Sequence, residues 1–194
     1  MLAATGGVNT HRGAIWALGL LAAASATMTQ DEFDAEEICM LAGRIARLPT
    51  SATTDASHGR SMFIRHGARG ARGEAEDGFA HVRKIALPEL HAARARLGDE
   101  SLARLHVLIA LLSRVDDTCV LYRGGRMALT AAKDGAARVL AAGVGTQRGR
   151  EELDALDRRL LALNASPGGC ADLLAATLFV DRITATKEDR DGNA

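Results

Sequence analysis

The sequence predicts an all-α protein that folds as a single multi-helix domain. Apolar residues recur every three or four positions along most of the chain, which is the spacing of one helix face. No stretch shows the alternating pattern of a β-strand, and aromatic residues make up only 3% of the 194 residues, too few for a β-sandwich. We therefore expect one helical domain over residues 1–185 and a charged, frayed tail over residues 186–194.

The first part of the chain predicts two helices and a loop. Asn9 or Thr10 can cap a helix that runs to about Met28. Asp34 can cap a second helix, which Pro49 stops. Residues 50–60 are rich in Ser, Thr and Gly and are expected to form an exposed loop.

The rest of the chain predicts a succession of helices. Pro88 begins one that Gly98 ends, and Asp99 caps the next over residues 100–114. Further helices are expected over residues 127–142, 151–163 and 167–183.

Charge and cysteine content exclude several functional classes. The 24 basic and 24 acidic residues cancel, so no general attraction to nucleic acid or to an anionic membrane is expected. All but three of the basic residues are arginines, whose planar donor fork suits phosphates and carboxylates. The three cysteines lie far apart and are odd in number, which favours a reducing compartment, the cytoplasm, over a disulfide framework or a zinc site.

An apolar run near the N-terminus can be interpreted as a helix of the domain or as a signal peptide. Residues 14–24 follow Arg12, and Ala24-Ser25-Ala26 resembles a signal-peptidase site. The run contains Gly19 and is too short to span a bilayer. We interpret it as part of a helix of the domain.

Four polar or glycine-rich segments are not explained by packing. The first, residues 6–13 with the sequence GGVNTHRG, directly precedes a helix, where free backbone N–H groups and the helix dipole favour an anion. Its candidate anion-binding residues are Gly7, Asn9, Thr10, His11 and Arg12. The alternative is a glycine turn followed by a helix cap.

The second segment, residues 67–79, combines glycines, arginines and acids. Arg69 and Arg72 suit phosphates, and Glu74 can serve as a base or metal ligand. The alternative is a flexible, solvated surface loop.

The third segment, residues 115–125, places two adjacent carboxylates after an apolar run. Asp116 and Asp117 are ligands of the kind that Mg²⁺ prefers, while one of them can instead cap the next helix.

The fourth segment, residues 166–174, has Ser166 at a predicted helix cap and Pro167 at the first helical position. Gly168 and Gly169 are poor helix formers, so the close approach of a phosphate or of a neighbouring backbone is expected there. Asp172 at the same helix end is a further candidate metal ligand.

Taken together and in this order, the four segments resemble the triphosphoribosyl-dephospho-CoA synthase family. The family's Gly-Gly-Val-Asn-Thr-His-Lys/Arg-Gly, Gly-Ala-Arg-Gly-Glu-Ala…Gly-Phe, Asp-Thr-Asn-Val-Leu-x-Arg-Gly-Gly and Ser-Pro-Gly-Gly-Ser-Ala-Asp-Leu-Leu motifs match residues 6–13, 70–79, 117–125 and 166–174. Cys119 stands where the family usually has Asn, and Cys170 where it usually has Ser. Family members also carry an earlier segment with Lys-Pro-Gly and Ser-His-x-Asp-Met motifs that is not found here, so we expect the chain to be N-terminally incomplete.

The resemblance implies a cytoplasmic, all-helical transferase. Such an enzyme condenses ATP with 3′-dephospho-CoA and releases adenine. Its product, 2′-(5″-triphosphoribosyl)-3′-dephospho-CoA, is the precursor of the acyl carrier protein prosthetic group of malonate decarboxylase or citrate lyase. The Arg- and Ala-rich composition favours the malonate pathway, and the oligomeric state does not follow from the sequence.

The chemistry of this transfer suggests roles for the candidate residues. Replacing a β-linked adenine by an α-linkage is an inversion, which favours direct displacement with a base, by analogy with inverting glycosidases. Glu74 is the expected base and Asp117 the second candidate. Mg²⁺ on Asp116, Asp117 or Asp172 would bridge phosphates. The remaining phosphate charge is assigned to Arg69, Arg72, Arg123 and the helix start at Ser166, Gly168 and Gly169.

Two other interpretations stay open at this point. One is a Mg²⁺-dependent helical hydrolase of a nucleotide or ADP-ribose-like substrate, which would not need dephospho-CoA. The other is a non-catalytic truncated remnant, which would show no saturable ATP binding and would expose apolar helix faces.

Overall fold

The computed structural model describes residues 11–29, 34–49 and 67–185, and every regular element in these ranges is helical. In chain order they are α1 (Arg12–Ser25), α2 (Ala35–Ala46), α4 (Gly70–Glu76), the π-helical turn η2 (Val82–Ala86), α5 (Leu87–Leu97), α6 (Glu100–Arg114), α7 (Thr118–Ala142), α8 (Gln147–Ala162) and α9 (Gly168–Thr184). The all-α prediction is confirmed. The expected loop at 50–60 and the expected tail at 186–194 lie outside the described residues.

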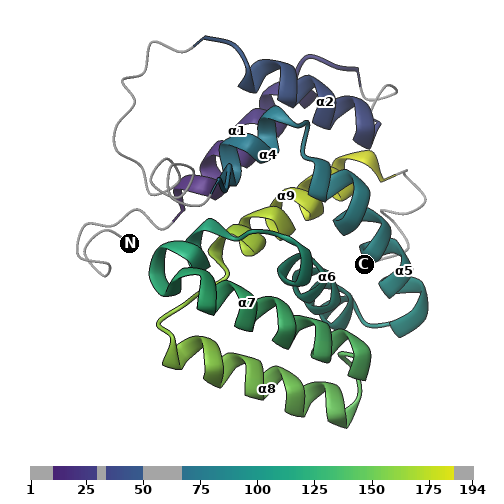
Figure 1. The fold of residues 1–194 in the computed structure, drawn as a ribbon. Coiled ribbons are helices and arrows are strands. Elements are labelled where there is room, and N and C mark those ends of the chain that lie inside the picture. The colour runs from purple at the N-terminus through teal and green to yellow at the C-terminus, as the bar shows by residue number, and fades with distance from the viewer. Residues whose placement is uncertain (1–10, 30–33, 50–66, 186–194) are drawn as a thin grey trace.

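The helices form two groups joined by α9 (Figure 1). Helices α1, α2 and α4 pack on one side, while α6, α7 and α8 pack on the other. Helix α9 contacts α1, α2, α6, α7 and η2, so it runs through the middle of the fold. Segments from both ends of the described chain therefore meet around one central helix.

One continuous apolar core extends from α1 to α9, as expected for a single helical domain. Its largest fully buried side chains include Phe79, Leu21, Ile38, Leu90 and Leu111. Many of the other buried positions are alanines, whose small side chains allow the helices to approach closely. No described helix is both long and apolar enough to cross a membrane.

Several predicted helix ends are confirmed by their capping contacts. Asp34 Oδ2 accepts a hydrogen bond from the Glu37 N–H at 3.0 Å, and Asp99 Oδ1 accepts one from the Leu102 N–H at 2.9 Å. Gly98 adopts the left-handed conformation with φ 64°, which ends α5 as predicted. The first helix begins at Arg12 without a side-chain cap, and the expected caps Asn9 and Thr10 lie outside the described residues.

The structure is more helical than expected in two places. The glycine-rich segment, for which a surface loop was an open alternative, contains the short helix α4, supported by the Arg72–Glu76 ion pair one turn apart. Helix α7 begins at Thr118 rather than near Met127, because Asp117 caps it and a kink at Gly125, with φ 67°, joins its two parts.

Pro88 explains the π-helical turn that precedes α5. Proline has no N–H to donate to the carbonyl of residue 84, and its ring crowds that carbonyl. The helix widens over Val82–Ala86 and resumes α-helical geometry at Leu87. The helix predicted from Pro88 therefore has an earlier beginning.

Candidate active site

Asp117 joins the starts of α7 and α9. Its side chain is 1% exposed. Oδ1 accepts hydrogen bonds from the N–H groups of Cys119 and Val120 at 2.8 and 3.2 Å, and Oδ2 accepts one from the N–H of Cys170 at 2.8 Å. The alternative in which one of the paired aspartates caps a helix is thus confirmed for Asp117. A role of Asp117 as base or metal ligand stays a prediction. In such a role its carboxylate would also have to keep these three hydrogen bonds.

The glycines at the start of α9 make room for residues at the start of α7. A Cβ on Gly169 would lie 3.1 Å from Asp117 Oδ2, and a Cβ on Gly168 would lie 3.1 Å from Cys119 Sγ. Neighbouring groups do come close to both glycines, but they are side chains rather than the expected backbone, and the approach of a phosphate stays a prediction. The Gly168 N–H donates to the Ser166 carbonyl oxygen at 2.9 Å, so this N–H already has a partner.

The predicted cap of α9 is wrong. Ser166 was expected to cap the helix with its side chain and Pro167 to be the first helical residue. The helix begins instead at Gly168, with Pro167 as its N-cap and no side-chain cap. Asp117 takes over this role from another helix, because its carboxylate accepts the Cys170 N–H.

Helix α1 reaches the same place through Gly13. A Cβ on Gly13 would clash with Asp172 Oδ2, so a larger residue there would require the Asp172 side chain to turn away. Burial, and then the nearby Asp117 charge, raise the pKa of Asp172 to about 6, against an opposing effect of His11. Within the described ranges, Asp172 has no hydrogen-bonding or ion-pairing partner.

The second segment joins this group through Gly70. This glycine has φ 57°, and a Cβ on it would lie 3.1 Å from Thr118 Cγ2. All four segments singled out in the sequence thus come together, since Gly13 contacts Asp172, Cys170 contacts Asp117, and Thr118 contacts Gly70. We call residues 117–120 and 168–172, together with Gly13, the helix-start junction.

The two cysteines of the junction are both shielded thiols. Burial raises the pKa of Cys119 to about 11, and burial together with Asp117 raises the pKa of Cys170 well above its usual value. All three cysteines of the chain are free. At neutral pH both junction thiols are therefore uncharged.

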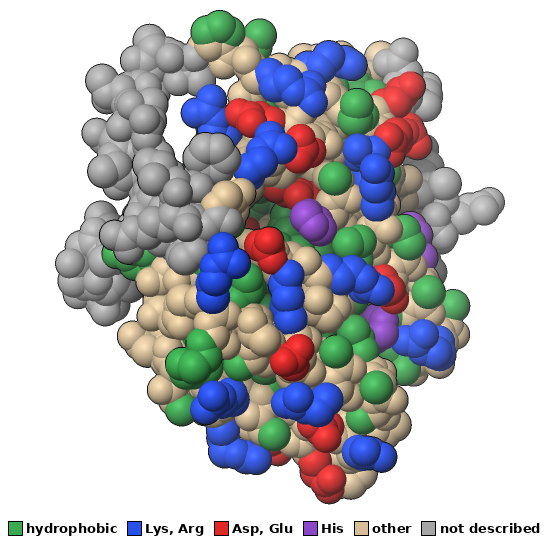
Figure 2. Space-filling view, viewed as in Figure 1, with side chains coloured by type: hydrophobic (Ala, Val, Ile, Leu, Met, Phe, Trp, Pro, Cys, Tyr) green, Lys and Arg blue, Asp and Glu red, His purple; other side chains and the backbone are tan. Residues whose placement is uncertain are grey.

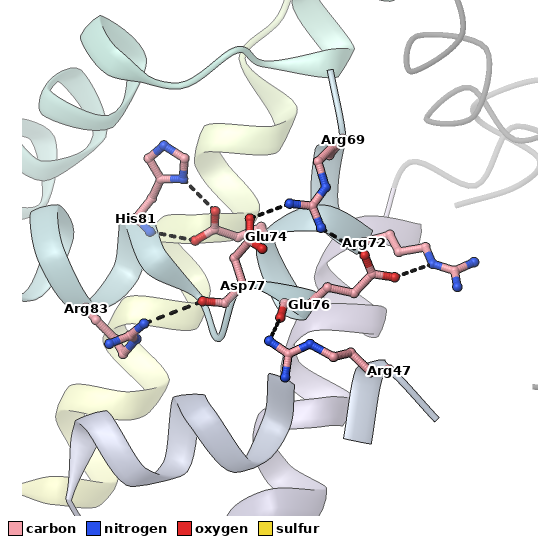
Figure 3. Close-up of polar contacts among 8 residues, drawn as sticks. All are labelled: Arg47, Arg69, Arg72, Glu74, Glu76, Asp77, His81 and Arg83. Carbon is pink, nitrogen blue, oxygen red and sulfur yellow. Dashed lines mark hydrogen bonds and ion pairs between the residues drawn. The ribbon is translucent and has the colours of Figure 1, made fainter. Parts of the chain in front are cut away.

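Glu74 makes two contacts with His81 (Figure 3). Its Oε1 accepts the backbone N–H of His81 at 2.7 Å, and its Oε2 lies 2.5 Å from His81 Nδ1. The Glu74 side chain is 9% exposed, against 36% for His81. The hydrogen bond to Glu74 raises the pKa of His81, and the charge of Asp116 raises it further, while burial and the charge of Lys133 oppose the rise. The pair is thus a partly sheltered carboxylate–imidazole unit of the kind used in proton transfer.

His81 is a candidate that the sequence did not single out. Glu74 and His81 are seven positions apart, a spacing that would not bring them together in this way on one straight helix. Gly78 and Phe79, with φ 66° and 54°, turn the chain between them. The Gly-Phe pair followed by a histidine was the available signal.

The arginines of the second segment already have acidic partners. Arg69 contacts Glu76 at 2.9 Å and Asp77 at 2.6 Å, and Arg72 contacts Glu76 at 2.8 Å (Figure 3). We call these four residues the arginine cluster. A role of Arg69 and Arg72 in phosphate binding stays a prediction, and it requires an exchange of partners, which costs little for exposed pairs.

The structure describes only some of the other predicted anion-binding residues. Arg123 is exposed and has no ion pair within the part of the chain that the structure describes. His11 and Arg12 are exposed at the start of α1, next to Gly13. Gly7, Asn9 and Thr10 lie outside the described residues.

The three predicted metal ligands do not act as one set. Asp116, 63% exposed, turns to Lys133 at 2.5 Å. Within residues 11–29, 34–49 and 67–185, no three His, Cys, Asp or Glu side chains are grouped to hold a metal ion. Mg²⁺ commonly takes one or two carboxylates plus substrate phosphates, and the half-buried Asp172, near the charge of Asp117, fits that smaller donor set. The magnesium ion itself stays a prediction.

The face of the molecule shown in Figure 2 is hollowed near its middle. A histidine lies at the edge of the hollow, acidic side chains lie beside it, and Lys and Arg side chains surround it (Figure 2). Both signs of charge therefore gather around one recess.

Comparison with known proteins gives a consistent result. A family model described as ATP:dephospho-CoA triphosphoribosyl transferase matches residues 1–191. A probable 2-(5''-triphosphoribosyl)-3'-dephosphocoenzyme-A synthase of Pseudomonas fluorescens is 53% identical over 94% of this chain and 63% of its own length. The 2-(5''-triphosphoribosyl)-3'-dephosphocoenzyme-A synthase of Klebsiella pneumoniae is 51% identical over 94% of this chain and 66% of its own length. The chain thus spans somewhat less than two thirds of the Pseudomonas relative, and no solved structure matches it.

Proposed function

The chain belongs to the ATP:dephospho-CoA triphosphoribosyl transferase family, and from that membership we propose that it takes part in condensing ATP with 3′-dephospho-CoA. The observation that supports this most is the meeting of four distant segments at the helix-start junction and Gly70. Helix packing alone does not require four polar, glycine-rich segments to meet. The binding of a large substrate with charged and reacting parts does require such segments to meet.

In the proposed reaction, the 2′-hydroxyl oxygen of dephospho-CoA attacks C1′ of the ATP ribose. The new C–O bond forms as the C1′–N9 bond to adenine breaks, with inversion at C1′. Glu74 accepts the hydroxyl proton, which balances the proton that adenine takes up on leaving. His81 holds the Glu74 carboxylate through its backbone N–H and its ring, so that the base keeps one orientation.

The triphosphate stays attached to the ribose during this step and must be held. The start of α1 offers His11 and Arg12, and Arg123 is an exposed cation on α7 without an ion pair within the described ranges. Asp172 with Asp117 would hold a magnesium ion, which supplies positive charge to the phosphates when bound. Arg69 and Arg72 would join after releasing Glu76.

The proposed product assigns a cellular role. A triphosphoribosylated dephospho-CoA is the precursor of an acyl carrier protein prosthetic group, in malonate decarboxylase or in citrate lyase. We propose that the protein serves such a pathway in the cytoplasm, with the malonate enzyme preferred.

Mass spectrometry of the protein incubated with ATP, Mg²⁺ and 3′-dephospho-CoA tests this function. We expect adenine and the condensed product in equal amounts, and no adenine when dephospho-CoA is omitted. Adenine or free phosphate formed equally well without dephospho-CoA would identify a hydrolase and overturn the proposal. No product and no saturable ATP binding would also overturn it, in favour of a non-catalytic chain.

A further inference from the structure

A shallow surface cavity of about 360 Å³, open to solvent, lies beside the π-helical turn, at a place that the reaction described above does not use. It is lined by Lys84, Ile85, Pro88, Glu89 and Ala92 from η2 and α5, and by Arg114 from the end of α6. Its volume is within the range of small-molecule sites. We call it the Lys84–Arg114 cavity.

The shape of this cavity follows from Pro88. The lining residues of η2 and α5 recur at the spacing of one helix face, and this face is widened where the helix passes through the π-helical turn. Ile85, Pro88 and Ala92 contribute apolar groups to its lining, and Pro88 and Ala92 are exposed. Such a surface suits a ligand with an uncharged chain as well as charge.

The charges of the cavity leave a positive excess. Lys84 has no ion pair within the part of the chain that the structure describes. Arg114 approaches Glu89 at 3.6 Å, a long contact, while Glu89 also contacts His106 Nε2 at 2.9 Å. The single carboxylate is thus shared, and two cations face the cavity.

Residues that line the cavity are close in the sequence to residues of the candidate active site at two points. His81 immediately precedes η2, so it lies about one helical turn from Lys84 and Ile85. Asp116 follows Arg114 by two residues, and its charge acts on His81. The cavity thus begins about one helical turn along the chain from the residue that contacts Glu74.

We propose that the Lys84–Arg114 cavity binds the diphosphate and the adjoining uncharged chain of the acceptor, dephospho-CoA, while its ribose lies at Glu74. This inference rests on the proposed function. Two cations match a diphosphate diester, and the apolar groups of the lining match the chain that continues from it.

The ATP triphosphate fits this cavity less well. It carries more negative charge, and Glu89 would repel it without a metal ion. The carboxylate proposed for Mg²⁺ is Asp172, which lies at the helix-start junction. Donor and acceptor phosphates are thus assigned to separate places, the helix-start junction and the Lys84–Arg114 cavity.

Equilibrium binding of each substrate alone, measured by calorimetry, tests the cavity without requiring turnover. Lys84→Ala and Arg114→Ala should each weaken dephospho-CoA binding about tenfold and change ATP binding less than about twofold. Lys84→Arg should restore most of the affinity. Arg96→Ala, which removes an exposed cation of the same helix outside the cavity, should leave both affinities unchanged.

The outcomes separate this inference from the proposed function. Unchanged dephospho-CoA binding in both alanine variants, an equal loss of ATP binding, or no dephospho-CoA binding by the unaltered protein would overturn the cavity assignment. Selective loss of dephospho-CoA binding in a protein that releases no adenine would support the cavity and overturn the transfer reaction. Adenine release with an unaltered KM for dephospho-CoA in Lys84→Ala would support the transfer reaction and overturn the cavity assignment.

Discussion

The helix-start junction and the arginine cluster both come from glycine-rich segments, yet they treat charge in opposite ways. At the junction, Asp117 is buried and bound by three backbone N–H groups, and Asp172 is half-buried without an ion pair within the described ranges. In the cluster, Arg69 and Arg72 are exposed and paired with Glu76 and Asp77. The first arrangement holds helices together around negative charge, whereas the second is a solvated surface network.

This contrast distinguishes a carboxylate whose burial costs free energy from ion pairs that can exchange partners at little cost. A half-buried carboxylate is unfavourable unless positive charge meets it, and the charge of His11 offsets the raised pKa of Asp172 only in part, so a cationic ligand would stabilise Asp172. Exposed ion pairs contribute about 0–1 kcal/mol and are easily exchanged. The residues that most strongly indicate a site are therefore the sheltered carboxylates.

The largest expected effect is on stability, at Asp117. Asp117→Ala leaves three backbone N–H groups near α7 and α9 without their acceptor, and should lower the free energy of unfolding by about 3 kcal/mol. Urea unfolding measures it. The neighbouring Asp116→Ala is the matched control, because it breaks only an exposed pair with Lys133 and should cost under about 1 kcal/mol. Equal losses in the two variants would remove the distinction between buried and exposed carboxylates.

A smaller effect is expected where α1 meets α9. Gly13→Ala places a Cβ against Asp172 and should lower the free energy of unfolding by about 1 kcal/mol. Gly19→Ala, in the same helix with nothing within 4 Å of an added Cβ, should raise it by about 0.5–1 kcal/mol. Thermal unfolding of both proteins measures the difference. If Gly13→Ala is stabilised as much as Gly19→Ala, the close contact with Asp172 does not exist in solution.

The smallest effect is a pH dependence at His81. Because Glu74 raises the pKa of His81 in the folded protein, the stabilisation is complete below the unfolded value of about 6.5 and is lost as pH rises through the folded value. As pH rises above about 6, the unaltered protein should therefore lose stability relative to His81→Gln. Unfolding midpoints at several pH values measure the slope. A constant difference between the two proteins would show that the imidazole and Glu74 are not coupled.

Much of the fold could be predicted from the sequence, because local signals and tertiary contacts agree there. Asp34, Gly98 and Asp99 end or begin helices by interactions within a few residues of the chain. Helix α4 was harder, because its glycines disfavour helix and its support comes from packing against α1 and α2. The π-helical turn could not be predicted without knowing that the helix begins before Pro88.

The segments that form the site could be predicted from the sequence, but the contacts between their side chains could not. The four segments could be singled out because packing does not explain their composition, and the structure brings them together. The pairing of Glu74 with His81 depends on a turn with two positive φ angles, which periodicity does not show. The pairing of Arg69 and Arg72 with Glu76 follows from α4 being a helix, which composition argued against.

Adenine release by Glu74→Gln and Glu76→Gln, two carboxylate variants of the same short helix, tests the central claim most directly. Glu74 is 9% exposed and bound to His81, while Glu76 is 24% exposed and paired with arginines. We predict that Glu74→Gln slows adenine release at least about 100-fold while ATP still binds, and that Glu76→Gln stays within about threefold of the unaltered protein. Near-normal release by Glu74→Gln, or an equal loss in both variants, would contradict the assignment of Glu74 as the base.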